Sequence, residues 1–278
     1  MSFCIMFAMQ SCTSDEEPMM PETTKSETSI SHMVVKFEDR IYETDAMTVG
    51  DSVRYLNEEY AEVYQSKIKN NPNIAAVVSS DSIGTTYVDY FPSEKKLLEK
   101  YEFIQLERNE NISGNATRSK IIDLVVGDNS SPILAVAELY DDKNFKDTEL
   151  ITYMTPQWFG SVPYLKDHGF NDKASSIKVY NKIKSSTYYT IYSVNFPYQK
   201  TYLGDWIRPV LKCYHNSYYE GGAIYCIATP PGSSVDHTDT NLKTIGWNDR
   251  ISSIEWLLVT NLSLIEGDNP SFPPHKPC

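Results

Sequence analysis

The sequence has few basic residues and no long apolar segment. Its 278 residues include 25 Lys and Arg against 37 Asp and Glu, which gives a formal net charge of -12. Because phosphate binding requires clustered Lys and Arg, this balance argues against nucleic acid as a partner and favours cations. No stretch reaches the roughly 18 apolar residues that a membrane-spanning helix needs.

Histidine and glycine are also scarce, and neither forms a recognisable functional motif. The 5 histidines share no metal-ligand or catalytic-triad spacing, and no glycine-rich phosphate loop occurs. The polar segment Asp236-His237-Thr238-Asp239 is expected to form a solvated turn. The sequence therefore predicts a protein that is not an enzyme.

The composition is that of a folded, β-rich chain, with 41% hydrophobic residues, 22% charged residues and 20 tyrosines. Its length allows two domains. We expect a mixed fold, in which a small α+β domain precedes an all-β sandwich. The expected segments are a signal and flexible tether (1–31), the α+β domain (32–106), a linker with an entry strand (107–133), the β-domain (134–260) and a tail (261–278).

Apolar spacing predicts individual elements in the α+β domain. These are strands at 33–37 and 40–44, a helix over 52–68, strands at 74–78 and 85–90, and a helix that Ser93 caps and that ends near Phe103. The domain is thus expected to begin with a β-hairpin.

The first residues resemble a bacterial lipoprotein signal. A short apolar run, Phe3 to Met9, is followed by Gln10-Ser11-Cys12 and then by the acidic group Asp15-Glu16-Glu17. This acidic group resembles the export tag of surface lipoproteins in the Bacteroidetes. The resemblance implies that Cys12 carries the lipid and that the protein is anchored to the outer membrane or cell surface. The alternative is a disordered N-terminus with an incidental cysteine.

Two further cysteines, Cys213 and Cys226, flank a predicted hairpin from Tyr214 to Tyr225. Their side chains could meet across paired strands and form a disulfide in an oxidising compartment. Two buried thiols are the alternative, because free cysteine is commonly a core residue.

A sequence pattern occurs twice in the β-domain, in the same order each time. The first copy contains Tyr140, Phe145 and Asp147, and later Asn171-Asp172-Lys173-Ala174-Ser175-Ser176. The second copy contains Tyr214, Tyr219 and Gly221, and later Asn248-Asp249-Arg250-Ile251-Ser252-Ser253. The repeat predicts two equivalent structural units.

This pattern resembles the βγ-crystallin family, whose Greek-key motif opens with an aromatic residue, a second aromatic five residues on, and a glycine two residues later. The second copy matches fully, whereas Asp147 stands where the first copy should have glycine. The resemblance implies a two-motif Greek-key sandwich over 134–260 with two calcium sites shared between the motifs.

The resemblance also implies which residues bind calcium, a hard cation that takes oxygen ligands. Side-chain oxygens are expected from Asp172, Asp249, Ser175 and Ser252. Backbone carbonyls are expected from Lys173, Arg250, Asp141 and His215, while Asn171 and Asn248 shape the turns. With about one carboxylate at each site, affinities should lie in the micromolar to millimolar range. They should also be unequal, because Asp147 replaces the glycine of the first copy. Without a metal, the same motifs would simply form turns and strand starts.

The function expected from these features is that of a calcium-binding surface lipoprotein in which the ion stabilises the β-domain. The alternative is a carbohydrate- or protein-binding adhesion module in which calcium is only structural. Its binding surface would be the N-terminal domain or the long aromatic insertion at 181–209, although core or edge packing is the commoner explanation for such aromatic residues.

Overall fold

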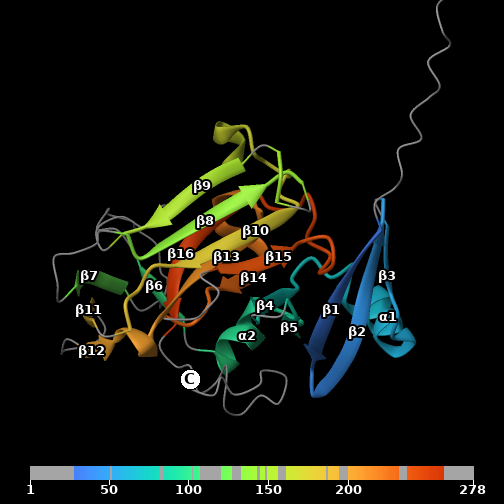
Figure 1. Cartoon of the computed structure of the whole chain (residues 1–278), viewed down its shortest axis with the longest axis horizontal. Helices are drawn as coiled ribbons and strands as arrows, with labels where there is room; N and C mark the ends of the chain where they lie inside the picture. Colours follow the sequence, from blue (N-terminus) through green and yellow to red (C-terminus); the bar gives the residue numbers. More distant parts are fainter. Residues whose placement is uncertain are drawn as a thin grey trace, which may run out of the picture.

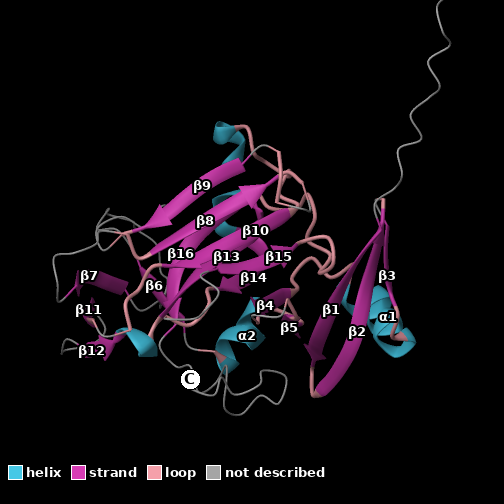
Figure 2. Cartoon of the chain, viewed as in Figure 1, coloured by secondary structure: helices cyan, strands magenta, loops and turns pink. Residues whose placement is uncertain are grey.

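A computed structural model shows a mostly β-sheet protein (Figures 1 and 2). The structure describes residues 28–50, 52–81, 84–101, 103–106, 120–126, 133–142, 145–147, 149–155, 161–185, 187–193, 200–231 and 237–259. No helix in these ranges is long and apolar enough to cross a membrane.

The N-terminal segment has the predicted hairpin, strand pair and capped helix. It contains β1 (Thr28–Phe37), β2 (Arg40–Val49), β3 (Ser52–Tyr55), α1 (Glu58–Val63), the π-helix η1 (Tyr64–Ile68), β4 (Ala75–Ser80), β5 (Thr86–Phe91), α2 (Glu94–Lys100) and β6 (Phe103–Leu106). Glu38, at φ 56°, forms the tight turn of the first hairpin. Ser93 caps α2 as predicted, because its hydroxyl accepts a hydrogen bond from the Lys96 amide at 3.4 Å.

The prediction of one helix over 52–68 is wrong in its first part. Residues Ser52–Tyr55 instead form the edge strand β3, which pairs with β2, and the helix begins only after Asn57. The Asn57 side chain accepts a hydrogen bond from the Tyr60 amide at 3.0 Å, which is an N-cap contact. Strand pairing therefore overrides the helical spacing at 52–55.

The remaining elements are mostly strands. They are β7 (Lys120–Val126), β8 (Ala135–Tyr140), β9 (Glu149–Met154), η2 (Leu165–His168), β10 (Ser176–Asn181), β11 (Tyr188–Ser193), β12 (Lys200–Leu203), η3 (Gly204–Trp206), β13 (Arg208–Asn216), η4 (Ser217–Tyr219), β14 (Glu220–Ile227), β15 (His237–Asn241) and β16 (Ser253–Val259). Together with β1 to β6, these strands form a 12-stranded and a 4-stranded sheet among the described residues.

The large sheet joins the two halves of the chain. Its strand order is β12-β11-β7-β6-β16-β13-β14-β4-β5-β1-β2-β3. Strand β4 runs parallel to β14, and β6 pairs antiparallel with β16. The strands predicted to belong to an N-terminal domain therefore continue the sheet of the β-domain, and one buried core contains residues from both.

The two repeat copies have the same three-strand arrangement, and each copy pairs with a segment of the other. In the small sheet, β8 lies between β9 and β10, and in the large sheet β13 lies between β14 and β16. Strand β15, which precedes the second motif, pairs with β10 of the first copy. In return, Val162 before the first motif bridges to Ile254 in β16. Each copy thus contributes a pairing segment to the sheet of the other.

The expectation of a solvated turn at 236–239 is wrong for the residues that the structure describes. His237 to Asn241 form β15 and pair in register with Ser176 to Tyr180. Residue 236 lies outside the described ranges. The polar sequence gives no alternation of apolar residues, so the strand is specified by its partner rather than by local propensity.

The core of the β-domain lies between the two sheets, which Figure 1 shows one over the other. Residues from both inner faces belong to one buried cluster, among them Leu139 and Val179 from the small sheet and Leu211 from the large sheet. The indole of Trp256 donates a hydrogen bond to the Thr152 hydroxyl at 3.3 Å and links the sheets directly. This packing holds the two repeat copies face to face.

Candidate metal centre

The two Asn-Asp motifs occupy equivalent loops, each between a turn and the start of a strand. Gly169 and Gly246 end the preceding turns with positive φ angles of 69° and 76°. Asp172 and Asp249 both have φ 53°, a left-handed conformation that Asp adopts more readily than most residues. Both loops therefore have the same backbone course.

Each motif is bonded reciprocally to the other. The Ser252 hydroxyl donates to Asp172 Oδ1 at 3.0 Å, and the Ser175 hydroxyl lies 3.4 Å from Asp249 Oδ1. The backbone repeats this exchange, since the amide of Asp172 donates to the carbonyl of Ile251 and that of Asp249 to the carbonyl of Ala174, both at 3.1 Å. The predicted carboxylate and hydroxyl ligands are thus brought together across the two copies, in pairs that sequence spacing did not reveal.

The paired serines and aspartates have the same pattern of burial in both copies. Ser175 and Ser252 are buried, whereas Asp172 and Asp249 are exposed. Each carboxylate also accepts a hydrogen bond from the side-chain amide of the asparagine before it, Asn171 or Asn248. The contact lies within each Asn-Asp turn, so each asparagine bonds to its own aspartate.

The aromatic hairpins lie against the motifs through their first residues. The carbonyl of Tyr140 accepts from the Ser175 amide at 2.8 Å, and that of Tyr214 from the Ser252 amide at 2.9 Å. Asp141 and His215, the predicted carbonyl ligands, are the next residues along each hairpin. They are therefore placed beside the motif serines.

Charges from both copies meet around His215. Burial lowers the pKa of His215, the positive charge of Arg250 lowers it further, and the Asp172 carboxylate acts in the opposite direction. The Arg250 guanidinium donates to the Gly246 carbonyl at 3.1 Å and stacks over the Trp247 ring at 5.6 Å. Its charge is thus held beside its own loop, while the first-copy carboxylate faces the second-copy hairpin. Lys173, the equivalent of Arg250, is exposed.

The second serine of each motif has a role that the sequence did not indicate. Ser176 and Ser253 donate hydrogen bonds to the carbonyls of Asp142 and Asn216, at 2.5 and 2.6 Å. The Ser253 hydroxyl also accepts from the Tyr219 amide at 3.0 Å. These serines fasten each hairpin to its own motif, and their equivalent position in both copies was the available signal.

The donor set suits a hard cation. Each Ser–Asp pair offers one carboxylate and one hydroxyl, and backbone carbonyls of the neighbouring hairpin lie close by. Oxygen ligands of this kind are those that calcium takes. No group of three or more His, Cys, Asp or Glu side chains that could hold a metal occurs in the part of the chain that the structure describes. A cation here would therefore depend on hydroxyl, carbonyl and water oxygens for most of its shell.

The two internal cysteines are buried and free. They lie on neighbouring strands but are not direct partners, because Cys213 faces Ile224 and Cys226 faces Leu211. Burial raises the pKa of the Cys213 thiol, and its contact with Cys226 raises it further. Of the two alternatives, the structure contains the pair of buried thiols.

Other predicted features fall largely on residues that the structure does not describe. Cys12 and the tether up to residue 27 lie outside the described ranges, as do residues 107–119 of the linker. The aromatic insertion forms β11 and β12, and its residue Trp206 is exposed. No protein-family model, curated protein or solved structure matches this chain.

Proposed function

We propose that residues 134–260 form a βγ-crystallin-like domain of two Greek-key motifs, which binds two calcium ions and is stabilised by them. The observation that carries this proposal is the reciprocal pairing of Ser252 with Asp172 and of Ser175 with Asp249. The exchange of pairing segments between the two sheets supports it. A cation at either pair would hold the two copies together.

The roles of the ligands follow from their surroundings. The exposed carboxylate supplies the negative charge at each site, and the buried serine of the other copy supplies a neutral oxygen. Lys173 or Arg250, with Asp141 or His215, would add backbone carbonyls. Because one carboxylate only partly offsets a doubly charged ion, affinities in the micromolar to millimolar range are expected.

Thermal unfolding in calcium and in chelator tests the proposal. A ligand that binds the native state stabilises it by RT ln(1 + [L]/Kd), or about 2.7 kcal/mol at a hundredfold excess over Kd. Millimolar calcium should therefore raise the melting temperature by several degrees. The Asp172→Asn and Asp249→Asn variants keep an acceptor for the partner serine but lose the charge, and together they should abolish the shift.

Asp167→Asn is a matched control, because Asp167 is also exposed and lies only five residues before Asp172. It should retain the full calcium shift. Titration calorimetry should count two sites with different affinities in the wild type and one in each single variant. Equal melting temperatures in calcium and chelator would refute the proposal.

We further propose that a lipid on Cys12 anchors the protein to the cell surface. Fatty-acid labelling in a bacterial host should mark the wild-type chain and be lost in Cys12→Ala. Labelling that persists in this variant would exclude Cys12 as the anchor, without bearing on calcium.

A further inference from the structure

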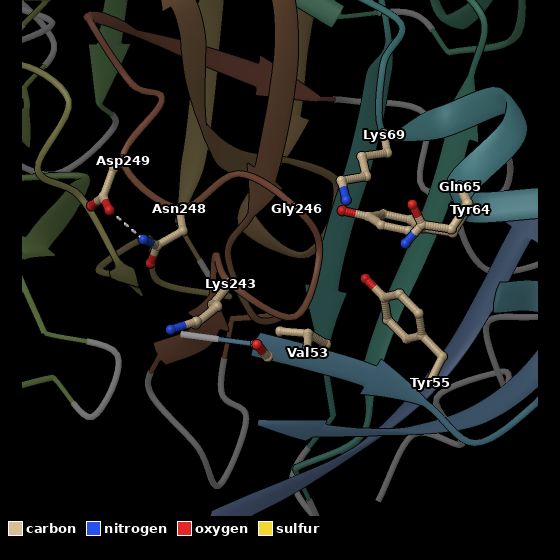
Figure 3. A pocket seen from close by; sticks show the side chains of 10 residues that line it. Val53, Tyr55, Tyr64, Gln65, Lys69, Lys243, Gly246, Asn248 and Asp249 are labelled. Atoms are coloured by element: carbon tan, nitrogen blue, oxygen red, sulfur yellow. Dashed lines mark hydrogen bonds between the residues drawn. The ribbon is translucent and has the colours of Figure 1, made fainter. Parts of the chain in front are cut away.

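The N-terminal segment contacts the β-domain at two places that differ in their access to water. At the first, β3, η1 and the loop at 243–249 surround a polar pocket of about 520 Å³, and the lining residues Gln65 and Lys69 are exposed (Figure 3). The Tyr55 hydroxyl holds this loop by donating to the carbonyl of Thr244 at 3.0 Å. At the second, α2 lies over the outer face of the large sheet, with largely buried charged side chains between them. The second contact therefore keeps ionisable groups away from water.

Lys212 lies in the middle of β13, on the face of the sheet that α2 covers. Its neighbours Leu211 and Cys213 belong to the core between the two sheets, so the alternation of a strand places Lys212 on the opposite face. Across the ladder it pairs with Tyr225 in β14 and with Glu255 in β16. Lysine is almost never fully buried unless it is paired, and this side chain is only 3% exposed. Its amino group is therefore enclosed between the sheet and the helix.

Two carboxylates and two aromatic rings surround the Lys212 side-chain nitrogen. Glu94 Oε1 lies 2.6 Å from this nitrogen, and Glu255 Oε1 lies 3.4 Å from it. The ring centres of Tyr214 and Tyr225 are 4.1 and 5.0 Å away. The Tyr225 hydroxyl donates to Glu94 Oε1 at 2.8 Å, and the Tyr214 hydroxyl donates to Glu255 Oε1. Each carboxylate is thus fixed beside the amino group by a tyrosine.

These four groups are the ones that amide condensation requires. Lys212 supplies a nitrogen nucleophile, and Glu94 supplies the carboxyl carbon that it can attack. Glu255 is placed to accept the proton that the amino group must lose. Tyr225 already donates to the Glu94 oxygen on which negative charge would develop during the attack. Because the fold holds the reactants in contact, proximity can supply an effective molarity of about 10⁵–10⁸ M.

We propose that Lys212 and Glu94 are joined by an isopeptide bond. The Lys212 nitrogen bonds to the carboxyl carbon of Glu94, while the bond from that carbon to one carboxyl oxygen breaks. This oxygen takes two protons from the ammonium group, by way of Glu255, and leaves as water, so no oxidant or co-reactant is required. The amide replaces a buried ion pair, whose charges are costly to hold out of water.

The bond ties the two halves of the chain together covalently. Its two residues are 118 positions apart, in α2 of the N-terminal segment and in β13 of the second copy. Neither reacting residue belongs to the candidate metal centre. The bond is therefore tested independently of calcium, with chelator present throughout.

A second lysine at the same contact serves as a matched control. Lys100 Nζ lies 2.6 Å from Asp89 Oδ2, which is as close as Lys212 lies to Glu94. The Lys100 side chain is 31% exposed, however, so its ammonium group stays hydrated and the pair remains ionic. Lys100→Arg should consequently leave the proposed bond intact.

Intact-mass spectrometry of the denatured full chain, with peptide mapping, measures the bond. The wild type should be lighter than its unlinked chain by the mass of one water, and a digest should contain one joined pair of peptides that holds Lys212 and Glu94. Lys212→Arg keeps a positive charge between the carboxylates but has no nucleophilic amine, so it should show the full mass and separate peptides. Lys100→Arg should show the same loss of water as the wild type.

Glu255→Gln tests the proton transfer, because both reacting residues remain in place. It should lower the linked fraction, since a positioned general base contributes roughly 10²–10⁴ in rate. Circular dichroism establishes that each variant is folded. A wild-type chain of full mass, or a loss of water that persists in Lys212→Arg or maps to Lys100, would overturn the proposal. An unchanged linked fraction in Glu255→Gln would overturn the role of Glu255.

Discussion

At the residue scale, Asp147 shows how the two copies differ while sharing one backbone. It has φ 68°, and its counterpart Gly221 has φ 82°. The second aromatic residues, Phe145 and Tyr219, also match, at φ 58° and 64°. The first hairpin thus accommodates aspartate at the position where the second copy has glycine. Asp147 adopts the left-handed conformation that glycine reaches without steric cost.

Asp147→Gly should consequently stabilise the protein. Glycine removes the steric cost of the left-handed conformation but has more entropy in the unfolded chain. The net effect should raise the free energy of unfolding by roughly 0.5–1 kcal/mol. The exposed aspartate forms no hydrogen bond or ion pair within the described residues, so the substitution removes no contact. Urea unfolding measures the difference.

Gly221→Ala is the reciprocal control. Alanine would have to adopt the left-handed conformation of Gly221, and its Cβ would lie 3.0 Å from the side-chain amide nitrogen of Asn216. The free energy of unfolding should therefore fall by roughly 1–2 kcal/mol. If Asp147→Gly lowered stability as well, the view that the two hairpins have equivalent backbones would need revision.

At the element scale, the sequence was informative where a local signal defined the structure. The tight turn at Glu38 and the cap at Ser93 depend on near neighbours, and both elements were predicted. The stretch at 52–68 was misread because Val53, Leu56 and Tyr60 have helical spacing. In the structure Leu56 is exposed between β3 and α1, so its spacing coincided with a helical pattern without belonging to a helix.

Elements that depend on distant partners could not be predicted in this way. Strand β15 has a polar sequence and exists because β10 lies beside it. The parallel pairing of β4 with β14 joins segments that sequence analysis assigned to separate domains. In both cases the strand partner lies far along the chain, where periodicity carries no information.

The candidate metal centre shows the same division. The repeat identified Asp172, Ser175, Asp249 and Ser252, because equivalent residues recur in equivalent order. That each serine pairs with the aspartate of the other copy required the three-dimensional arrangement. The pocket walls were beyond sequence analysis altogether, since Tyr55 and Thr244 are separated by 189 positions.

At the scale of the whole molecule, a cluster of buried tyrosines joins the N-terminal segment to the β-domain. Tyr60 is fully buried, and the centre of its ring lies 4.8 Å from that of Tyr55 and 6.2 Å from that of Tyr64. The rings of Tyr55 and Tyr64 are themselves 4.8 Å apart. The hydroxyls of Tyr55 and Tyr90 bond to the loop that leads into the second motif. The two halves therefore depend on the same buried phenols.

Because of this cluster, we expect the protein to lose stability as the pH rises above about 10. Burial raises the pKa of Tyr55, Tyr60, Tyr64 and Tyr90 above the ordinary value of 10.0, because the phenolate is disfavoured in the core. Above that value the unfolded chain releases these protons while the folded chain retains them. The stabilising contribution of each tyrosine is thus complete below pH 10 and is lost as the pH rises toward the folded-state pKa.

Comparison of the wild type with Tyr60→Phe isolates this effect. Lysines that titrate in the same pH range change the stability of both proteins equally. Above pH 10 the free energy of unfolding should fall more steeply in the wild type than in the variant, by about 1.4 kcal/mol per pH unit. Urea unfolding at a series of pH values measures the two slopes, and phenolate absorbance should report ionisation of the cluster together with unfolding. Identical slopes, or ionisation of the cluster before unfolding, would contradict the assignment of Tyr60 to a core that both halves share.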